Sequence, residues 1–250
     1  MLEQPMFDDN IHNILGIFTN PRPAGAVPLD PHAVVKHLTS SLSLSKSCFE
    51  NYKLAILYLK EILIVRPQIR AKFLASRRRQ GASALGMNEL PSEIAGIIEP
   101  SPAEGDHDLH KELIEMLLFS IDDLIRQHEE VTGEAKPICL ADDDEGLVKQ
   151  YRTQLIKILK TSKFYNPEEI LNTFPENKLL EERAVLLGCV GRYNRAIFIY
   201  IQNLGKPSAA EAYCDDVYLR EGCHGGCLPF VCGCWSSNHV TGCHNFATRR

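Results

Sequence analysis

The sequence predicts an all-α fold, an α-solenoid of antiparallel helical hairpins. Apolar residues recur with the 3.6-residue period of an amphipathic helix in one segment after another. No segment alternates apolar and polar residues with the period of two that a half-buried strand shows. Because each helix of a hairpin carries an apolar stripe, a hairpin needs a neighbour on each side, and a stacked solenoid supplies those neighbours.

The clearest hairpin lies between residues 179 and 214. Its first helix places Leu180, Ala184 and Leu187 on one face. Its second helix carries a longer apolar stripe, formed by Tyr193, Ala196, Ile197, Tyr200, Ile201 and Leu204. We expect the tyrosines Tyr151, Tyr193 and Tyr200 to be core aromatics on such stripes and not binding anchors.

Glycine and proline mark the ends of this hairpin. Gly191 separates its two helices, and Gly205 follows the second where a left-handed residue ends a helix. Pro207 then suits the first turn of a third helix, where no amide donor is needed. Gly188 and Ala196 are small, which predicts a close crossing of two helices at these positions.

Residues 1–74 are predicted to form an N-terminal segment of the solenoid. Helical periodicity appears over residues 8–18, from Pro31 onward and over 52–65, with a second short helix over 68–74 after Pro67. Asp30 directly before Pro31 is a strong helix start, because an N-cap acceptor precedes proline at the first helical position.

Residues 75–106 are predicted to be a flexible linker or insertion, because they lack a long periodic segment and are rich in proline, glycine and serine. A basic cluster lies where the preceding helix enters this stretch: Arg70, Lys72, Arg77, Arg78 and Arg79. The cluster could bind phosphoinositides or act as an import signal. We favour a solvated helix end whose cations complement the helix dipole.

Residues 107–219 are predicted to form a second, clathrin-repeat-like solenoid segment. It begins with a long amphipathic helix over residues 109–128 and contains a clear helix start at Asn166 and Pro167. An acidic run, Asp142, Asp143, Asp144 and Glu145, precedes another helix. The run lacks the glycine and the terminal glutamate of a calcium-binding loop, so we interpret it as a helix cap in a solvated loop.

Composition limits the possible functions. The chain is 44% hydrophobic and 24% charged with a net charge of −5, which is ordinary for a folded protein and gives no nucleic-acid footprint. Apolar runs are too short to span a bilayer, and the start of the chain does not resemble a signal peptide, so we expect an intracellular location. No phosphate-binding loop, dinucleotide fingerprint or catalytic constellation is present, so we expect neither an enzyme nor a cofactor.

The tail, residues 220–250, differs in character from the rest. It gathers five cysteines that could supply zinc ligands: Cys223, Cys227, Cys232, Cys234 and Cys243. Their spacings do not form two separated CxxC pairs, and the tail lacks helical periodicity. We therefore expect the tail to be disordered or to come from an incorrectly predicted exon, with a zinc-binding module as the alternative.

Residues 146–219 resemble a known protein family. The hairpin reads LLEERAVLLGCVGRYNRAIFIYI, and it is preceded by YRTQLIKILKTSKFYNPEEILNTFPENK. These stretches resemble the clathrin-repeat region of the vacuolar protein sorting thirty-nine (Vam-six-like) family, whose animal relatives include the transforming growth factor-beta receptor-associated protein. The β-propeller of that family is not found in this chain, and the cysteine-rich tail does not match its C-terminal domain.

The resemblance implies a scaffold subunit, or part of one, in a HOPS or CORVET type membrane-tethering complex. Its implied partners are other tethering subunits, in particular the eleven subunit, and a late-endosomal Rab GTPase. The implied location is cytoplasmic and peripheral on the late endosome and lysosome or vacuole, reached through partners. Two alternatives remain: an adaptor in growth-factor and Smad signalling, and a zinc-binding tail module.

Overall fold

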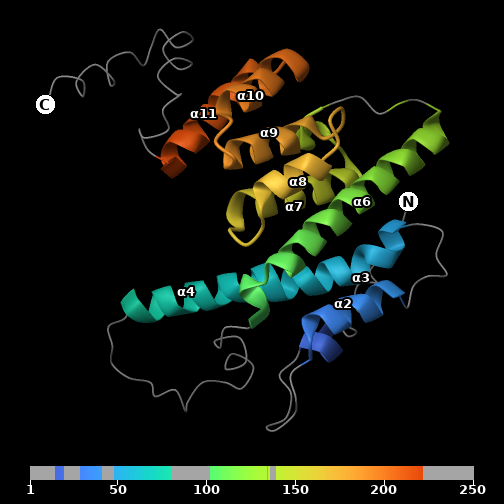
Figure 1. Ribbon diagram of the computed structural model, residues 1–250, viewed down its shortest axis with the longest axis vertical. Coiled ribbons are helices and arrows are strands. Elements are labelled where there is room, and N and C mark those ends of the chain that lie inside the picture. The colour runs from blue at the N-terminus through green and yellow to red at the C-terminus, as the bar shows by residue number, and fades with distance from the viewer. Residues whose placement is uncertain are drawn as a thin grey trace, which may run out of the picture. The chain divides into compact units, whose positions relative to one another are not determined.

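The computed structural model describes residues 15–19, 29–40, 48–79, 102–133, 135 and 139–221 (Figure 1). All regular secondary structure in these ranges is helical, which confirms the predicted all-α class. The chain divides into two compact units. The first comprises residues 1–135 and 162–165, and the second comprises residues 136–161 and 166–250. None of the helices in the described ranges combines the length and apolarity needed to cross a bilayer.

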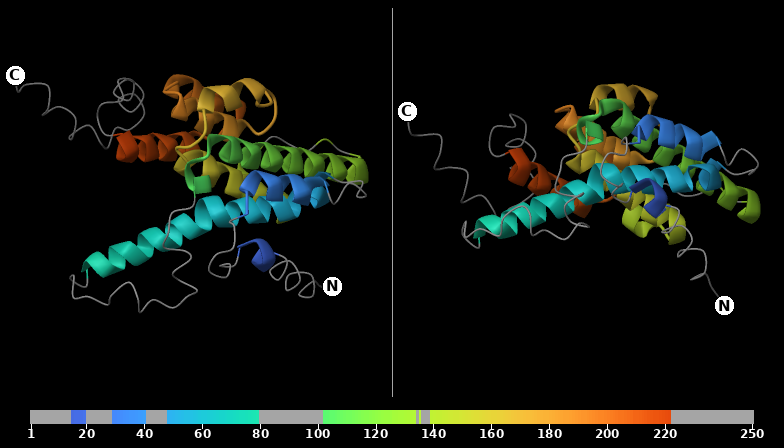
Figure 2. Two further views of the ribbon diagram at one scale, coloured as in Figure 1. Left: turned by 60° about the horizontal axis from the view of Figure 1, so that its bottom comes forward. Right: turned by 90° about the horizontal axis from the view of Figure 1, so that it is seen from below.

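The first unit is built around two long helices that pack together. Its α-helices are α2 (Pro31–Ser40), α3 (Cys48–Lys60), α4 (Arg66–Arg79) and α6 (His107–Thr132). Helix α3 packs against both α2 and α6 (Figures 1 and 2). The shared core is aliphatic and consists of Val34, Val35, Leu38, Ala55, Ile56, Leu59, Leu109, Leu113, Ile114, Leu117 and Ile121.

Side-chain caps fix where these helices begin. The Asp30 carboxylate accepts hydrogen bonds from the backbone amides of His32 and Ala33 at 3.2 and 3.3 Å, so the helix start predicted here is confirmed. Asp106 caps α6 in the same way, although the sequence interpretation assigned Asp106 to the linker. Gly133, with a φ of 73°, ends α6 in the left-handed conformation that glycine adopts without strain.

Residues 68–74, expected to extend the preceding helix as a second short helix after Pro67, are helical but do not form a separate helix. A π-helical turn, η1 (Glu61–Val65), joins α3 to α4 in one continuous helical run (Figure 2). The Arg66 amide bonds to the Glu61 carbonyl five residues earlier, so the turn is wider than an α-helical turn. Pro67 has no amide hydrogen and its ring crowds the preceding turn. The wider turn directly before it lets the helix continue.

The expected linker over residues 75–106 is structured at both ends. Helix α4 continues to Arg79, and a 3₁₀ turn, η3 (Pro102–Gly105), leads directly into the Asp106 cap. Residues 80–101 lie outside the described residues. At the N-terminus, residues 15–19 are helical, and the remainder of the helix expected over 8–18 lies outside the described residues.

The second unit contains the central hairpin and its neighbours. Its helical elements are η4 (Ala141–Asp143), α7 (Gly146–Thr161), α8 (Pro167–Thr173), α9 (Leu180–Cys189), α10 (Tyr193–Phe198), η5 (Ile199–Asn203) and α11 (Pro207–Glu221). Helix α9 lies at the centre and packs against α7, α8, α10 and η5. It is therefore buried on several sides, and Ala184 and Leu186 are fully inaccessible.

The turn of the hairpin follows the predicted pattern. Gly191 has a φ of 77°, and the amide of the next residue, Arg192, bonds to the Leu187 carbonyl at 2.8 Å. Gly205, with a φ of 62°, ends the second arm of the hairpin. The arm itself is α-helical over α10 and π-helical over η5, which residue periodicity did not reveal.

The boundary between the units differs from the predicted segments. The sequence interpretation grouped residues 107–219, but α6 belongs to the first unit. Helix α6 buries its stripe against α3, including Leu113 and Leu117. Periodicity shows that a helix has an apolar face but does not show which other face will cover it.

Candidate functional site

A buried ionic cluster lies at the centre of the second unit. Arg152 on α7 donates from Nε and Nη2 to the two carboxylate oxygens of Glu182 on α9, at 2.7 and 2.9 Å. Its Nη1 donates to Asp144 Oδ2 at 2.6 Å. Exposed fractions are 4% for the Arg152 side chain, 2% for Asp144 and 0% for Glu182. Such a planar, two-pronged arrangement is the strongest form of ion pair available to arginine.

The charge state of this cluster follows from its contacts. Burial acts to lower the pKa of Arg152, but the hydrogen bonds and charges of Glu182 and Asp144 outweigh it and raise the pKa, so the guanidinium stays charged. The carbonyl of Cys139 accepts a further Nη1 hydrogen bond at 3.2 Å. Burial, followed by the charge of Asp144, raises the pKa of the Cys139 thiol. The thiol is therefore a poor nucleophile, and the donors of Arg152 are engaged in structural bonds.

The same cluster holds the segment that leads into α7. Glu181 accepts the backbone amide hydrogen of Ala141 at 2.6 Å, and burial raises the pKa of this carboxyl. Asp143 forms a surface ion pair with Lys206 at 3.1 Å. The interpretation of the acidic run as a solvated cap is therefore wrong for Asp144, which is buried and ion-paired.

The sequence contained a signal for this cluster. Arg152 lies on the buried stripe of α7, one turn after Val148 and one turn before Leu155. Glu182 likewise lies on the buried face of α9. Because an unpaired buried charge is costly, opposite charges on the buried stripes of two neighbouring helices predict a pair.

Tight packing between helices explains the small residues of the hairpin. Ala196 is fully buried, as its predicted position at a crossing requires. A Cβ atom at Gly188 would overlap the hydroxyl oxygen of Tyr213 on α11, so the close approach there is to a side chain of the third helix. The Tyr213 ring lies 5.3 Å from that of Tyr200, measured between centroids. Tyr200 and Tyr151 are buried, as predicted for core aromatics, whereas Tyr193, for which the same was predicted, is only partly buried.

A second polar cluster surrounds His110 in the first unit. This histidine on α6 is 2% exposed, and its Nε2 lies 3.1 Å from the Glu104 carbonyl oxygen. Since a carbonyl only accepts, Nε2 carries the proton, and Nδ1 accepts from the Ser162 hydroxyl at 3.0 Å. The ring also packs on Phe164, with centroids 5.4 Å apart. Burial lowers the pKa of His110, which favours this neutral form.

The predicted basic cluster is partly neutralised. Both terminal nitrogens of Arg70 bond to the two carboxylate oxygens of Glu104, so Arg70 is unavailable to an anionic lipid. Lys72 is exposed, and the side chains of Arg77, Arg78 and Arg79 lie outside the described residues. The expectation of a solvated helix end is therefore wrong for Arg70, which lies nine residues before the end of α4 and is ion-paired with Glu104.

The metal ligands that the sequence suggests lie in the tail, residues 220–250. Within the part of the chain that the structure describes, no group of three or more histidine, cysteine or carboxylate side chains is arranged to hold a metal ion. The zinc candidates of the tail, Cys223, Cys227, Cys232, Cys234 and Cys243, lie outside the described residues. The clusters at Arg152 and His110 are saturated by internal bonds, so their role is to fix helices and loops.

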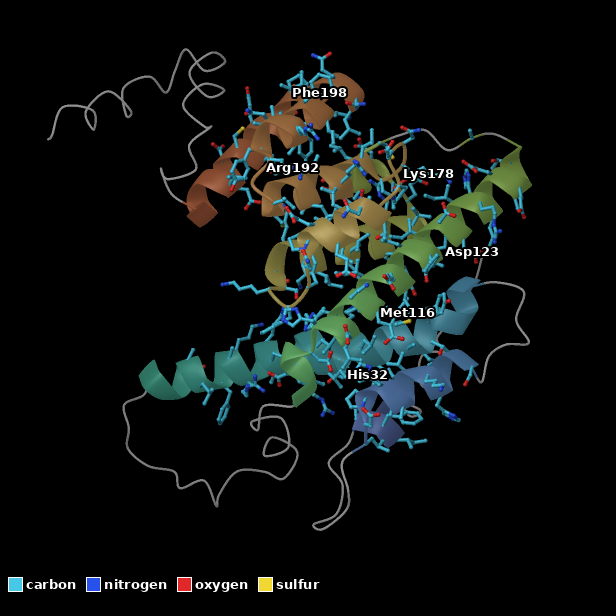
Figure 3. All side chains as sticks on the ribbon, in the orientation of Figure 1. His32, Met116, Asp123, Lys178, Arg192 and Phe198 are labelled. Carbon is cyan, nitrogen blue, oxygen red and sulfur yellow. The ribbon has the colours of Figure 1, made fainter. Side chains whose placement is uncertain are left out.

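The outer face of the hairpin is the part that faces solvent. Three residues spaced three apart on α10 and at its start, Arg192, Arg195 and Phe198, are exposed, and we name them the hairpin ridge. Figure 3 labels two of them, Arg192 and Phe198, on this hairpin. The ridge offers charge and apolar surface on a fixed helix, which suits binding to another protein.

Comparison with known proteins gives the relationship of this chain. It is 34% identical over 111 residues to a Vam6/Vps39-like protein of Homo sapiens and 33% identical over 118 residues to a vacuolar protein sorting-associated protein 39 homolog of Drosophila melanogaster. A vacuolar sorting protein 39 of Arabidopsis thaliana is 39% identical over 67 residues. The expected resemblance is confirmed for part of the chain.

The match covers only part of this chain and only a small part of each relative. It covers 44% of this chain and 12% of the human Vam6/Vps39-like protein, and 47% of this chain and 12% of the Drosophila homolog. For the Arabidopsis protein the shares are 27% and 7%. The matched part thus spans about one eighth of the length of the human and Drosophila relatives. No family model matches the chain, and no solved structure matches it.

Proposed function

We propose that this chain is a scaffold segment of a HOPS-type membrane-tethering complex that acts in transport to the lysosome or vacuole. The observation that carries the proposal is its similarity to Vam6/Vps39-like and vacuolar sorting 39 proteins from animals and a plant. The proposed partners are other tethering subunits, with the eleven subunit and a late-endosomal Rab GTPase as the first candidates. The proposed location is the cytoplasmic side of the late endosome or vacuole.

The geometry of the described residues supports a mechanical role. A scaffold in a tether must keep a defined shape so that bound partners are held near each other at high effective concentration. Arg152 and its carboxylates connect α7, α9 and the segment before α7 inside the second unit. His110 and Asp106 fix the start of α6 inside the first unit. These buried bonds favour rigid helical units with their outer faces free for protein contacts.

Affinity purification of the full chain tests the proposal. The tagged chain would be purified from cells, and bound proteins would be quantified by mass spectrometry. We expect tethering subunits to be enriched over a tag-only control. A full chain carrying Glu182→Lys, which places a cation against Arg152, is the matched control and should lose these partners through unfolding of the second unit. Absence of every tethering subunit from the wild-type purification would refute the proposal.

A further inference from the structure

The turn and second arm of the hairpin have a charge opposite to that of the whole chain. The chain carries a net charge of −5, yet residues 188–206 contain no aspartate or glutamate. The same stretch contains Arg192, Arg195 and Lys206. Lys206 is engaged with Asp143, which leaves the two arginines as the local source of positive charge. The segment is therefore locally basic within an acidic protein.

The two arginines of the hairpin ridge differ from the other described arginines in their ion pairing. The other arginines whose side chains the structure describes are all ion-paired, and they are Arg66, Arg70, Arg126, Arg152 and Arg183. Arg192 and Arg195 are exposed, and within the described ranges neither guanidinium has an ion-pair partner. Their bidentate donors therefore remain available to a carboxylate from outside.

Phe198 completes the ridge with an exposed aromatic ring. Its side chain is 59% exposed, whereas Ala196 and Ile197 on the opposite side of α10 are buried. Arg195 and Phe198 lie one turn apart on α10, and Arg192 directly precedes the helix as its N-cap residue. Ile201, in the π-helical turn η5 that follows α10, is partly exposed. A partner helix can receive exposed side chains of this kind in the groove between its own side chains.

We propose that the hairpin ridge docks an acidic amphipathic helix of a partner protein. The ring of Phe198 would fill a gap between apolar side chains of that helix, and Arg192 and Arg195 would pair with carboxylates beside the gap. Recruitment to an anionic membrane is less well matched, because it takes about four to eight clustered basic residues. This inference rests on the proposed scaffold function and names the surface that would meet a partner.

Site-specific photo-crosslinking in cells tests the docking surface. A benzophenone amino acid would replace Phe198 in the full chain, and crosslinked peptides would be identified by mass spectrometry. The matched control is the same replacement at Phe119 on α6, a phenylalanine that is 60% exposed and whose ring lies 6.4 Å from that of Tyr52, measured between centroids. We expect position 198, and not position 119, to crosslink to an acidic helical segment of another protein. Crosslinks to lipid, to a second copy of this chain or to a segment without net negative charge would overturn the inference.

Charge reversal of the two arginines provides a second test of the docking surface. Combining Arg192→Glu and Arg195→Glu with the label at position 198 should lower the crosslinking yield by about tenfold or more, because attraction becomes repulsion. Circular dichroism would check that these exposed substitutions leave the fold intact. An unchanged yield would overturn the inference. If the wild-type chain and the charge-reversed chain recover tethering subunits equally, the docking role of the hairpin ridge is refuted and the scaffold function is supported. If neither chain recovers tethering subunits but position 198 still crosslinks to an acidic helix, the scaffold function is refuted and docking at the hairpin ridge is supported.

Discussion

Replacing Arg152 with methionine should destabilise the second unit strongly. Methionine fills much of the same volume but removes the cation that neutralises two buried carboxylates, Glu182 and Asp144. It also removes the hydrogen bonds of Nε and Nη2 to Glu182 and those of Nη1 to Asp144 and to the Cys139 carbonyl. We expect a loss of about 3–5 kcal/mol in the free energy of unfolding, the usual cost of removing one partner of a buried ion pair.

The neutral version of the cluster is the control. Adding Glu182→Gln and Asp144→Asn to Arg152→Met removes the two uncompensated charges. This triple variant should recover about 2 kcal/mol or more relative to the single variant, because amides are much less costly to bury than carboxylates. The recovery separates the effect of unpaired charge from the effect of altered packing.

Native-state hydrogen exchange in increasing urea is the assay. It reports the free energy of opening for peptides of each unit separately, which matters in a chain of two units that need not unfold together. Peptides from α7 and α9 should lose protection in the Arg152→Met chain, while peptides from α3 keep theirs. A loss below about 1 kcal/mol, or a triple variant no more stable than the single one, would refute the reasoning about buried charge.

Three further predictions follow from single contacts. Gly188→Ala should cost about 1–3 kcal/mol, because its methyl group overlaps the Tyr213 hydroxyl, and adding Tyr213→Phe should restore part of the loss in urea unfolding. In a His32→Asn background, which removes the other side-chain partner of Asp106, Asp106→Ala should lower the stability of the first unit by about 1 kcal/mol by removing the α6 cap, and a larger effect from Asp106→Asn would contradict a capping role. Because burial lowers the pKa of His110 below its unfolded value near 6.5, the stability contributed by its neutral form is present above that pH and falls as the pH drops below it. His110→Gln should flatten this part of the profile of stability against pH, and an unchanged slope would contradict the role given to His110.

A second histidine must be separated from this pH effect. The hydrogen bond to Asp106 at 3.0 Å raises the pKa of His32. Its stabilising contribution is therefore complete below the unfolded pKa and is lost as the pH rises through the folded value, the opposite direction to that of His110. Comparing His110→Gln with the wild-type chain in a His32→Asn background isolates the buried group.

Local features were predictable because they depend on nearby residues alone. The stripes of the central hairpin, the cap at Asp30 and the left-handed glycines Gly191 and Gly205 all follow from helical periodicity and backbone preference. Tyr151 and Tyr200 lie on apolar stripes and are buried. The failure at Pro67 has a local cause too, since a π turn relieves the clash that normally ends a helix at proline.

The sequence by itself determined the helices, their apolar faces and most of their ends. Only the tertiary structure decided which faces meet: α6 covers α3, and Gly188 meets Tyr213 of α11. It also turned an acidic run that looks like a solvated cap into a partner of Arg152. The reason is that periodicity and capping are short-range properties of the chain. Contacts between residues such as Gly188 and Tyr213 depend on how the segments between them fold, which no local pattern specifies.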